Sequence, residues 1–105
     1  MSINMAAFLA AWQRDDACCL AFRPGSELSF SPLPRPTLTL RIQPSYLHDK
    51  LIRQVLTWRF QHPARYDGCF ISMEADGSLA VLCHPTPDDE PCALISMLSA
   101  LLDLQ

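Results

Sequence analysis

Charge and glycine are both scarce in this sequence. Only 18% of its 105 residues are charged, and the eight Lys and Arg residues are scattered singly from Arg14 to Arg65. Because nucleic-acid binding needs clustered positive charge, these scattered cations and a net charge of −3 argue against it. The three glycines, Gly25, Gly68 and Gly77, lie too far apart to form a glycine-rich phosphate-binding loop. Nucleotide and nucleic-acid binding are therefore excluded as leading functions.

The sequence also lacks a segment that could cross a membrane. The apolar run from Met5 to Trp12 is far too short to span a bilayer. No basic region of a signal peptide precedes it. The cysteines are odd in number and lack the spacing of a secreted disulfide framework: Cys18, Cys19, Cys69, Cys83 and Cys92. We therefore expect a protein of the reducing cytoplasm, without membrane insertion, whose thiols act as small core hydrophobes.

No residue pattern typical of a metal centre or a catalytic site is present. Zinc sites usually take Cys pairs a few residues apart, whereas Cys18-Cys19 and Cys83-His84 are adjacent and would point to opposite faces of a strand. Cys92 lies near a predicted helix start, which favours thiolates, but three acidic residues directly before it oppose that effect. His84 could approach Cys92, yet nothing in the sequence orients the pair. We expect no catalytic residue, no metal and no cofactor, and so no enzyme.

What the sequence has in excess is apolar residues. They make up 50% of the chain and only 18% is charged, and this charged fraction is low for a free-standing domain with so much surface for its volume. The length leaves room for one core, so residues 1–105 are expected to form a single domain. The apolar excess predicts an interface with another subunit or a partner.

Hydrophobic periodicity divides the chain into eight elements. Helical spacing predicts helices over residues 2–14 with Ser2 as N-cap, 45–61 with Ser45 as N-cap, and 92–104. The second helix must stop at His62-Pro63, because proline cannot continue it. Alternating apolar residues predict strands around 18–22, 28–30, 37–43, 69–73 and 79–83, the last two joined by a turn at Asp76-Gly77. The order α-β-β-β-α-β-β-α predicts an α+β fold, a small and mostly antiparallel sheet with helices packed on it.

Two sets of apolar residues have no evident cover inside such a fold. Phe70 and Leu82 fall on the hairpin face opposite the core face, which carries Ile71, Met73 and Val81. The last helix is apolar most of the way round, which is more than one sheet face can cover. Its uncovered residues are expected to be Met97, Leu98 and Leu101. We expect both sets to bind a partner.

The segment from Leu51 to Leu104 resembles a known family. Leu51-Ile52-Arg53-Gln54-Val55-Leu56-Thr57-Trp58 leads through Pro63 to a strand, the Asp76-Gly77 turn, a second strand and a leucine-rich helix. This pattern resembles the small class I chaperones of bacterial type III secretion systems, particularly those serving the secretion gatekeeper. The resemblance implies a cytoplasmic bacterial dimer without cofactor, with contacts from Ser45–Gln61 and Cys69–Cys83. On the second helix these contacts would be Leu51, Val55 and Trp58.

Two functions are compatible with these features. The leading one is a type III secretion chaperone-like protein that binds a secreted or regulatory protein partner through hydrophobic surface and keeps it export-ready or controls it. The alternative is a structural or regulatory subunit of a heteromeric secretion assembly that is not itself a client chaperone. A chaperone dimer, homo- or heteromeric, should be soluble by itself, whereas an obligate subunit should aggregate without its partner.

Overall fold

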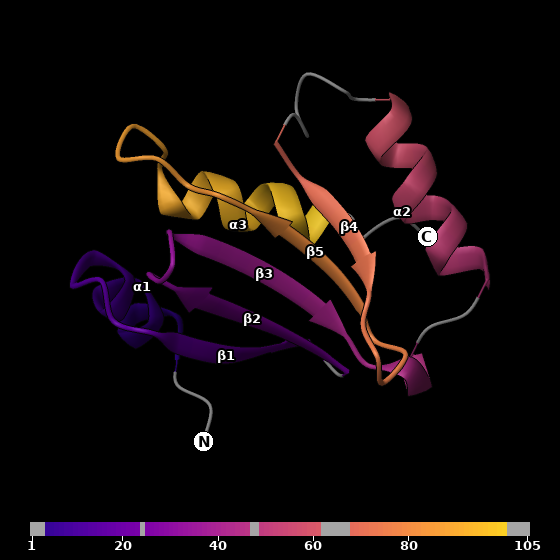
Figure 1. The fold of residues 1–105 in the computed structure, drawn as a ribbon, viewed down its shortest axis with the longest axis horizontal. Helices are drawn as coiled ribbons and strands as arrows, with labels where there is room; N and C mark the ends of the chain where they lie inside the picture. Colours follow the sequence, from indigo (N-terminus) through magenta and orange to yellow (C-terminus); the bar gives the residue numbers. More distant parts are fainter. Residues whose placement is uncertain (1–3, 24, 47–48, 62–67, 101–105) are drawn as a thin grey trace.

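The computed structural model describes residues 4–23, 25–46, 49–61 and 68–100 as three α-helices, a short 3₁₀ helix and a five-stranded sheet (Figure 1). The strand order is β1-β2-β3-β5-β4, and each neighbouring pair is antiparallel. This element order and this sheet confirm the α+β fold predicted from the sequence.

The first three strands form a meander whose register follows the apolar alternation. They are β1 (Cys18–Arg23), β2 (Ser26–Ser31) and β3 (Thr37–Ile42). Leu20, Leu28 and Leu40 lie opposite one another across the three strands, and all three are buried. Because side chains alternate between faces, this register directs the apolar set of each strand to one side of the sheet.

The hairpin forms at the predicted turn and continues the sheet from β3. It consists of β4 (Phe70–Met73) and β5 (Leu79–Cys83). The Asp76 side chain accepts a hydrogen bond from the Ser78 backbone N–H at 2.8 Å, and Gly77 has a φ of 91°, which glycine adopts without strain. β5 lies between β3 and β4, so β4 is an edge strand.

α1 (Met5–Gln13) is capped by a different residue from the one predicted. The side chain of Asn4 accepts a hydrogen bond from the Ala7 N–H at 2.8 Å, so Asn4 is the N-cap. The predicted cap, Ser2, lies outside the described residues. Phe8 is buried against the sheet, while the small Ala6 and Ala7 face outward.

α2 (Asp49–Gln61) begins later than predicted from Ser45. Residues Pro44–Tyr46 instead form the 3₁₀ helix η1, in which the Tyr46 N–H donates to the Gln43 carbonyl at 3.0 Å. The chain thus turns before α2 starts, and Asp49 places a favourable negative charge in the first turn. The helix ends at Gln61, directly before His62-Pro63, as predicted.

α3 (Pro91–Ala100) has the apolar residues of the predicted last helix but a different exposure pattern. Ile95 and Leu98 are buried, and the exposed positions are Cys92, Ala93 and Ser96. The prediction that this helix needs cover from outside the fold is therefore wrong for the described part. Its large side chains point inward and its outer side consists of small ones.

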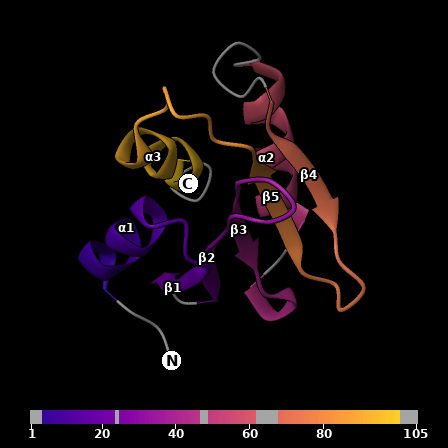
Figure 2. The same ribbon diagram turned by 60° about the vertical axis from the view of Figure 1, so that its left-hand side comes forward.

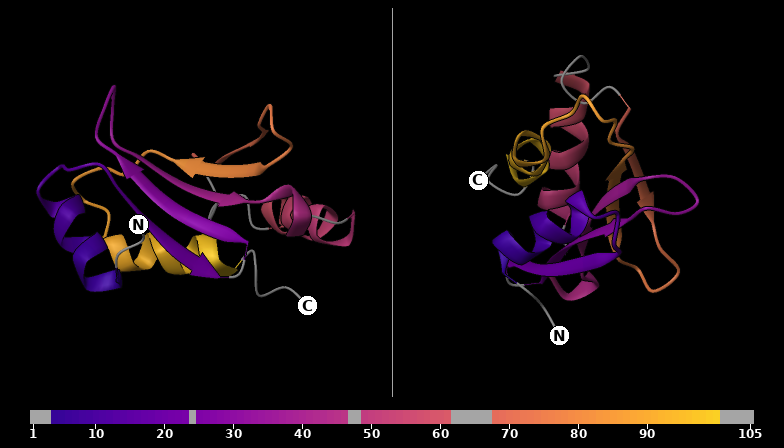
Figure 3. Two further views of the ribbon diagram at one scale, coloured as in Figure 1. Left: turned by 90° about the horizontal axis from the view of Figure 1, so that it is seen from below. Right: turned by 90° about the vertical axis from the view of Figure 1, so that its left-hand side faces the viewer.

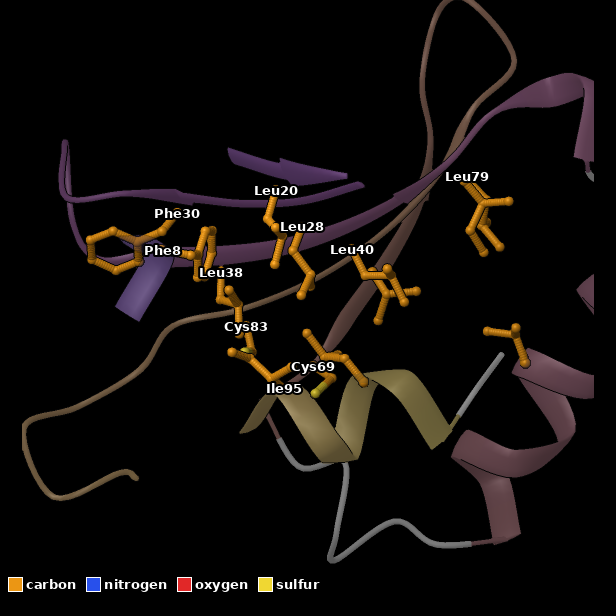
Figure 4. Close-up of a cluster of buried hydrophobic side chains, with 14 residues drawn as sticks. Phe8, Leu20, Leu28, Phe30, Leu38, Leu40, Cys69, Leu79, Cys83 and Ile95 are labelled. Carbon is orange, nitrogen blue, oxygen red and sulfur yellow. The ribbon is translucent and has the colours of Figure 1, made fainter. Parts of the chain in front are cut away.

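All three helices contribute to one core on the same face of the sheet, which we call the inner face. Phe8 of α1, Val55 of α2 and Ile95 of α3 join the buried strand residues in one cluster. Figure 4 shows Leu38, Cys83 and Ile95 among the side chains between the sheet and α3. Figures 2 and 3 show α1 and α3 on this side, whereas the β2–β3 loop projects from the opposite, outer face. Within the described residues, the outer face carries no helix.

Gly25→Ala is expected to destabilise the protein more than Gly68→Ala. The two glycines have φ values of 79° and 82°, so the backbone cost of alanine is similar at both. A Cβ at Gly25 would overlap the Tyr46 ring, whereas none of the described residues has an atom within 4 Å of a Cβ at Gly68. We expect Gly68→Ala to lower the free energy of unfolding by about 1 kcal/mol, and Gly25→Ala by about 1–3 kcal/mol more, in urea denaturation. Adding Tyr46→Ala should recover part of that excess, and equal losses at the two glycines would contradict the overlap.

Candidate protein-binding surfaces

The exposed large apolar side chains gather away from α1 and α3. In the described part of the chain they are Leu33, Tyr46, Leu56, Phe70 and Met73. Leu56 belongs to α2, and Phe70 and Met73 belong to β4, which lies beside α2 at one end of the molecule (Figure 1). This end therefore carries most of the apolar surface that the fold leaves uncovered.

An open groove with a volume of about 140 Å³ lies between α2 and the hairpin. Val55 and Leu79 are buried in its lining, whereas Leu56 and Met73 are 42% and 57% exposed. Ser72 is the polar residue of an otherwise apolar wall, and such a wall suits the apolar side chains of a partner. We call this site the α2–β4 groove; it is lined by Ile52, Val55, Leu56, Ile71, Ser72, Met73 and Leu79.

The groove adjoins an open sheet edge. β4 pairs with β5 on one side, and among the described residues no strand pairs with its other side. An unpaired edge presents backbone N–H and C=O groups that another strand can use. Ile71 and Met73 belong to both β4 and the groove lining, so a strand added at this edge would also contact the groove.

A second apolar surface lies on the outer face at the same end of the sheet. Phe70 and Leu82 are opposite each other across β4 and β5, and the Phe70 and His84 rings are 5.9 Å apart. The Nδ1 atom of His84 is 3.2 Å from both the Thr37 Oγ1 atom and the Pro36 carbonyl oxygen. These contacts fix the imidazole next to the aromatic ring. We call Phe70, Leu82 and His84 the outer patch.

A charged cluster borders the outer patch on the same face. The Arg41 guanidinium donates a hydrogen bond to Glu74, and its Nη1 atom is 3.6 Å from Oε1 of Glu27. The hydrogen bond to Glu74 is the main reason that the pKa of Arg41 is raised. The cluster ties β2 and β3 to the end of β4 and gives this part of the outer face a charged character.

The residues predicted to bind a partner occupy different environments. Phe70 is 52% exposed and Leu82 is partly exposed, both on the outer face as expected. Met97 is partly buried against the core. Leu98 is fully buried within the core, where it cannot contact a partner, because α3 turns its large side chains toward the sheet. Leu101 lies outside the described residues.

The residues predicted for a dimer lie on α2 but are mostly turned inward. Val55 is fully buried, and Leu51 packs partly buried against the core. The side chain of Trp58 lies outside what the structure describes. The sequence analysis did not identify the two exposed residues of the groove, since it assigned Met73 to the core face and gave Leu56 no role in binding. Their signal in the sequence is their place at the margin of each apolar pattern, Leu56 directly after Val55 on the helix and Met73 at a strand end.

The titratable groups of the described residues give no sign of a reactive centre. In the described part of the chain, no three His, Cys, Asp or Glu side chains are grouped so that they could hold a metal ion. A hydrogen bond with Cys69 and burial together raise the pKa of the Cys83 thiol, so this buried pair stays neutral and unreactive. Cys19 and Cys92 are exposed, so the prediction of core thiols is wrong for these two. None of the described helices combines the length and apolar character that a bilayer crossing requires.

Comparison with known proteins places this fold among characterised ones. A model of the HrpV-like family matches residues 2–104. A solved chain from the ExsC–ExsE complex superposes with a TM-score of 0.51, at 13% sequence identity, over 98% of this chain and 90% of that chain. At this identity the likeness supports the fold alone, and it agrees with the predicted chaperone-like architecture. A search of curated proteins found no match.

Proposed function

Because the chain belongs to the HrpV-like family of chaperone-like regulators in type III secretion, we propose that it works by binding protein chains at the β4 end of its sheet and not by catalysis. The observation that carries this proposal is the concentration of exposed apolar side chains beside an unpaired strand edge. Exposed Leu56, Phe70 and Met73 would be costly on a surface that meets only water.

The α2–β4 groove suits a second copy of this chain. If two β4 edges pair antiparallel about a twofold axis, the sheet continues from one protomer into the other, and neither β4 edge stays open. The same symmetry would bring each Leu56 and Met73 against the partner protomer. These two side chains therefore replace Val55, which the core already buries, as the expected centre of the dimer interface.

The outer patch suits an extended segment of a different protein. Phe70 and Leu82 form an apolar pair on the helix-free face of the described sheet, a surface on which alternate side chains of an extended chain can pack. The structural neighbour was solved as a complex of ExsC with ExsE, so this fold accommodates a bound protein in that case. For this chain the partner would be a secreted or regulatory protein of the bacterial cytoplasm, kept export-ready or controlled by the contact.

The double substitution Phe70→Ser with Leu82→Ser is expected to weaken partner binding by about tenfold or more, because two apolar side chains leave the contact. The measurement is the affinity for the protein that co-purifies with the chain from its native cytoplasm, with circular dichroism to confirm the fold. Cys19→Ser with Ser29→Ala is the control, since both residues lie on the outer face at the β1–β2 end, opposite each other.

A folded double variant with unchanged affinity would show that the outer patch is not the binding site. Loss of the fold would assign Phe70 and Leu82 to the core and would also contradict the proposal. Aggregation of the wild-type chain whenever its partner is absent would favour the alternative of an obligate subunit in a larger assembly.

A further inference from the structure

The β2–β3 loop, residues 32–36, carries the most exposed large apolar side chain among the described residues. Leu33 is 77% exposed, compared with 57% for Met73, the next highest. The loop projects from the outer face, away from α1 and α3, in both views of Figure 3. The loop therefore lies on the same side of the sheet as the outer patch. Among the described residues, little covers the Leu33 side chain.

Several contacts hold this loop in one conformation. Pro32, Pro34 and Pro36 restrict the backbone. The Ser31 hydroxyl donates to the Leu33 carbonyl at 2.9 Å, and the Thr37 hydroxyl donates to the Arg35 carbonyl at 3.0 Å. A loop that is already ordered loses little conformational entropy when a partner binds it.

The base of the loop is joined to the outer patch through His84. The Thr37 hydroxyl donates its proton to the Arg35 carbonyl, so it can only accept a hydrogen bond from His84. The Nδ1 atom of His84 therefore carries a proton and is the donor. The same N–H group faces the Pro36 carbonyl oxygen at 3.2 Å. His84 thus contacts the loop through its Nδ1 atom. Its ring also lies against the ring of Phe70, with the two ring centroids 5.9 Å apart. The loop and the outer patch form one continuous surface.

The charge of the loop indicates what kind of chain would bind there. Arg35 is exposed, and no carboxylate pairs with it in the part of the chain that the structure describes, whereas Arg14 and Arg41 both have acidic partners. An anionic membrane is a poor occupant, because the chain carries a net charge of −3. A protein segment with a carboxylate next to a large apolar side chain matches both Arg35 and Leu33.

We propose that the β2–β3 loop is a second, specificity-determining contact for the protein that occupies the outer patch. Leu33 packs against an apolar side chain of the bound segment, and Arg35 pairs with a carboxylate beside it. This inference rests on the proposed function, and it adds a charge preference that the apolar outer patch alone does not impose.

A phage-displayed library of random peptides, selected on the wild-type protein, tests the inference. The enriched peptides are expected to carry Asp or Glu next to Leu, Ile or Phe. Their affinity, measured by fluorescence anisotropy, should fall about tenfold or more on Leu33→Ser, as expected for the loss of one buried leucine. Arg35→Glu should also lower the affinity of these peptides. Replacing the peptide's Asp or Glu by Lys should restore binding to the Arg35→Glu variant but not to the wild type. Neither variant should change the oligomeric state.

The outcomes separate the two proposals. If the selected peptides lose affinity for Phe70→Ser but bind Leu33→Ser and Arg35→Glu like the wild type, the loop inference is wrong and the outer patch remains. If none of the three variants changes affinity, both are wrong. Binding to phosphatidylglycerol vesicles that depends on Leu33, in place of peptide binding, would also overturn the assignment to a protein partner.

Discussion

Leu98→Ala is expected to lower the free energy of unfolding by about 2–5 kcal/mol, because it removes a fully buried side chain and leaves a cavity in the core. A domain of this size has a total stability of roughly 5–15 kcal/mol, so the variant should be close to unfolding. Urea denaturation followed by circular dichroism measures the loss. The sequence pattern had assigned Leu98 to a partner surface, and this experiment distinguishes that role from a core role.

Leu94→Ala on the same helix is the matched control. Leu94 is only partly buried against the core, so its loss should be smaller than that of Leu98. If Leu98→Ala changed the oligomeric state without changing stability, α3 would be an interface helix and the packing described above would be incorrect.

The double substitution Leu56→Asp with Met73→Asp is expected to convert the protein from a dimer to a monomer. Both side chains are about half exposed in the single chain, so the charges cost little stability there. In a twofold dimer they would bury four carboxylates near one another, and the dissociation constant should rise by at least about 100-fold. Sedimentation equilibrium at several concentrations measures the change.

Leu33→Asp is the control for this prediction. It places the same charge on a leucine that is more exposed than Leu56 but lies in the β2–β3 loop, outside the groove. It should leave the dimer intact. A wild-type protein that is monomeric at all concentrations would contradict the prediction, and so would a double variant that still dimerises.

Much of the sheet could be predicted from the sequence because strand periodicity has a simple geometric meaning. Alternation in Thr37–Ile42 predicts the buried apolar residues of β3, although Thr39 on the other face is buried as well. The Asp76-Gly77 pair predicts where the hairpin turns. These are local properties of the backbone, set by pleating and by the φ angle that glycine tolerates. The end of α2 was predictable for a similar reason, since Pro63 forbids its continuation.

The exposure of individual apolar residues could not be predicted in the same way, because it depends on what packs against each face. Leu98 and Met73 both belong to apolar patterns, yet one is fully buried and the other is 57% exposed. Leu98 belongs to the core cluster, whereas Met73 ends β4, which in the described sheet has a neighbouring strand on one side only. The sequence alone contains the pattern but not the position of β4 at the edge, and that position determines the candidate site.

Amide hydrogen exchange along β4, Phe70–Met73, tests most directly the claim that this edge is a protein-binding surface. Exchange should be slow in concentrated wild-type protein, where a second strand would occupy the edge, and fast in the Leu56→Asp/Met73→Asp variant. The other edge strand, β1, should exchange alike in both. Equal exchange of the β4 amides in wild type and variant, or a difference confined to β1, would contradict the account.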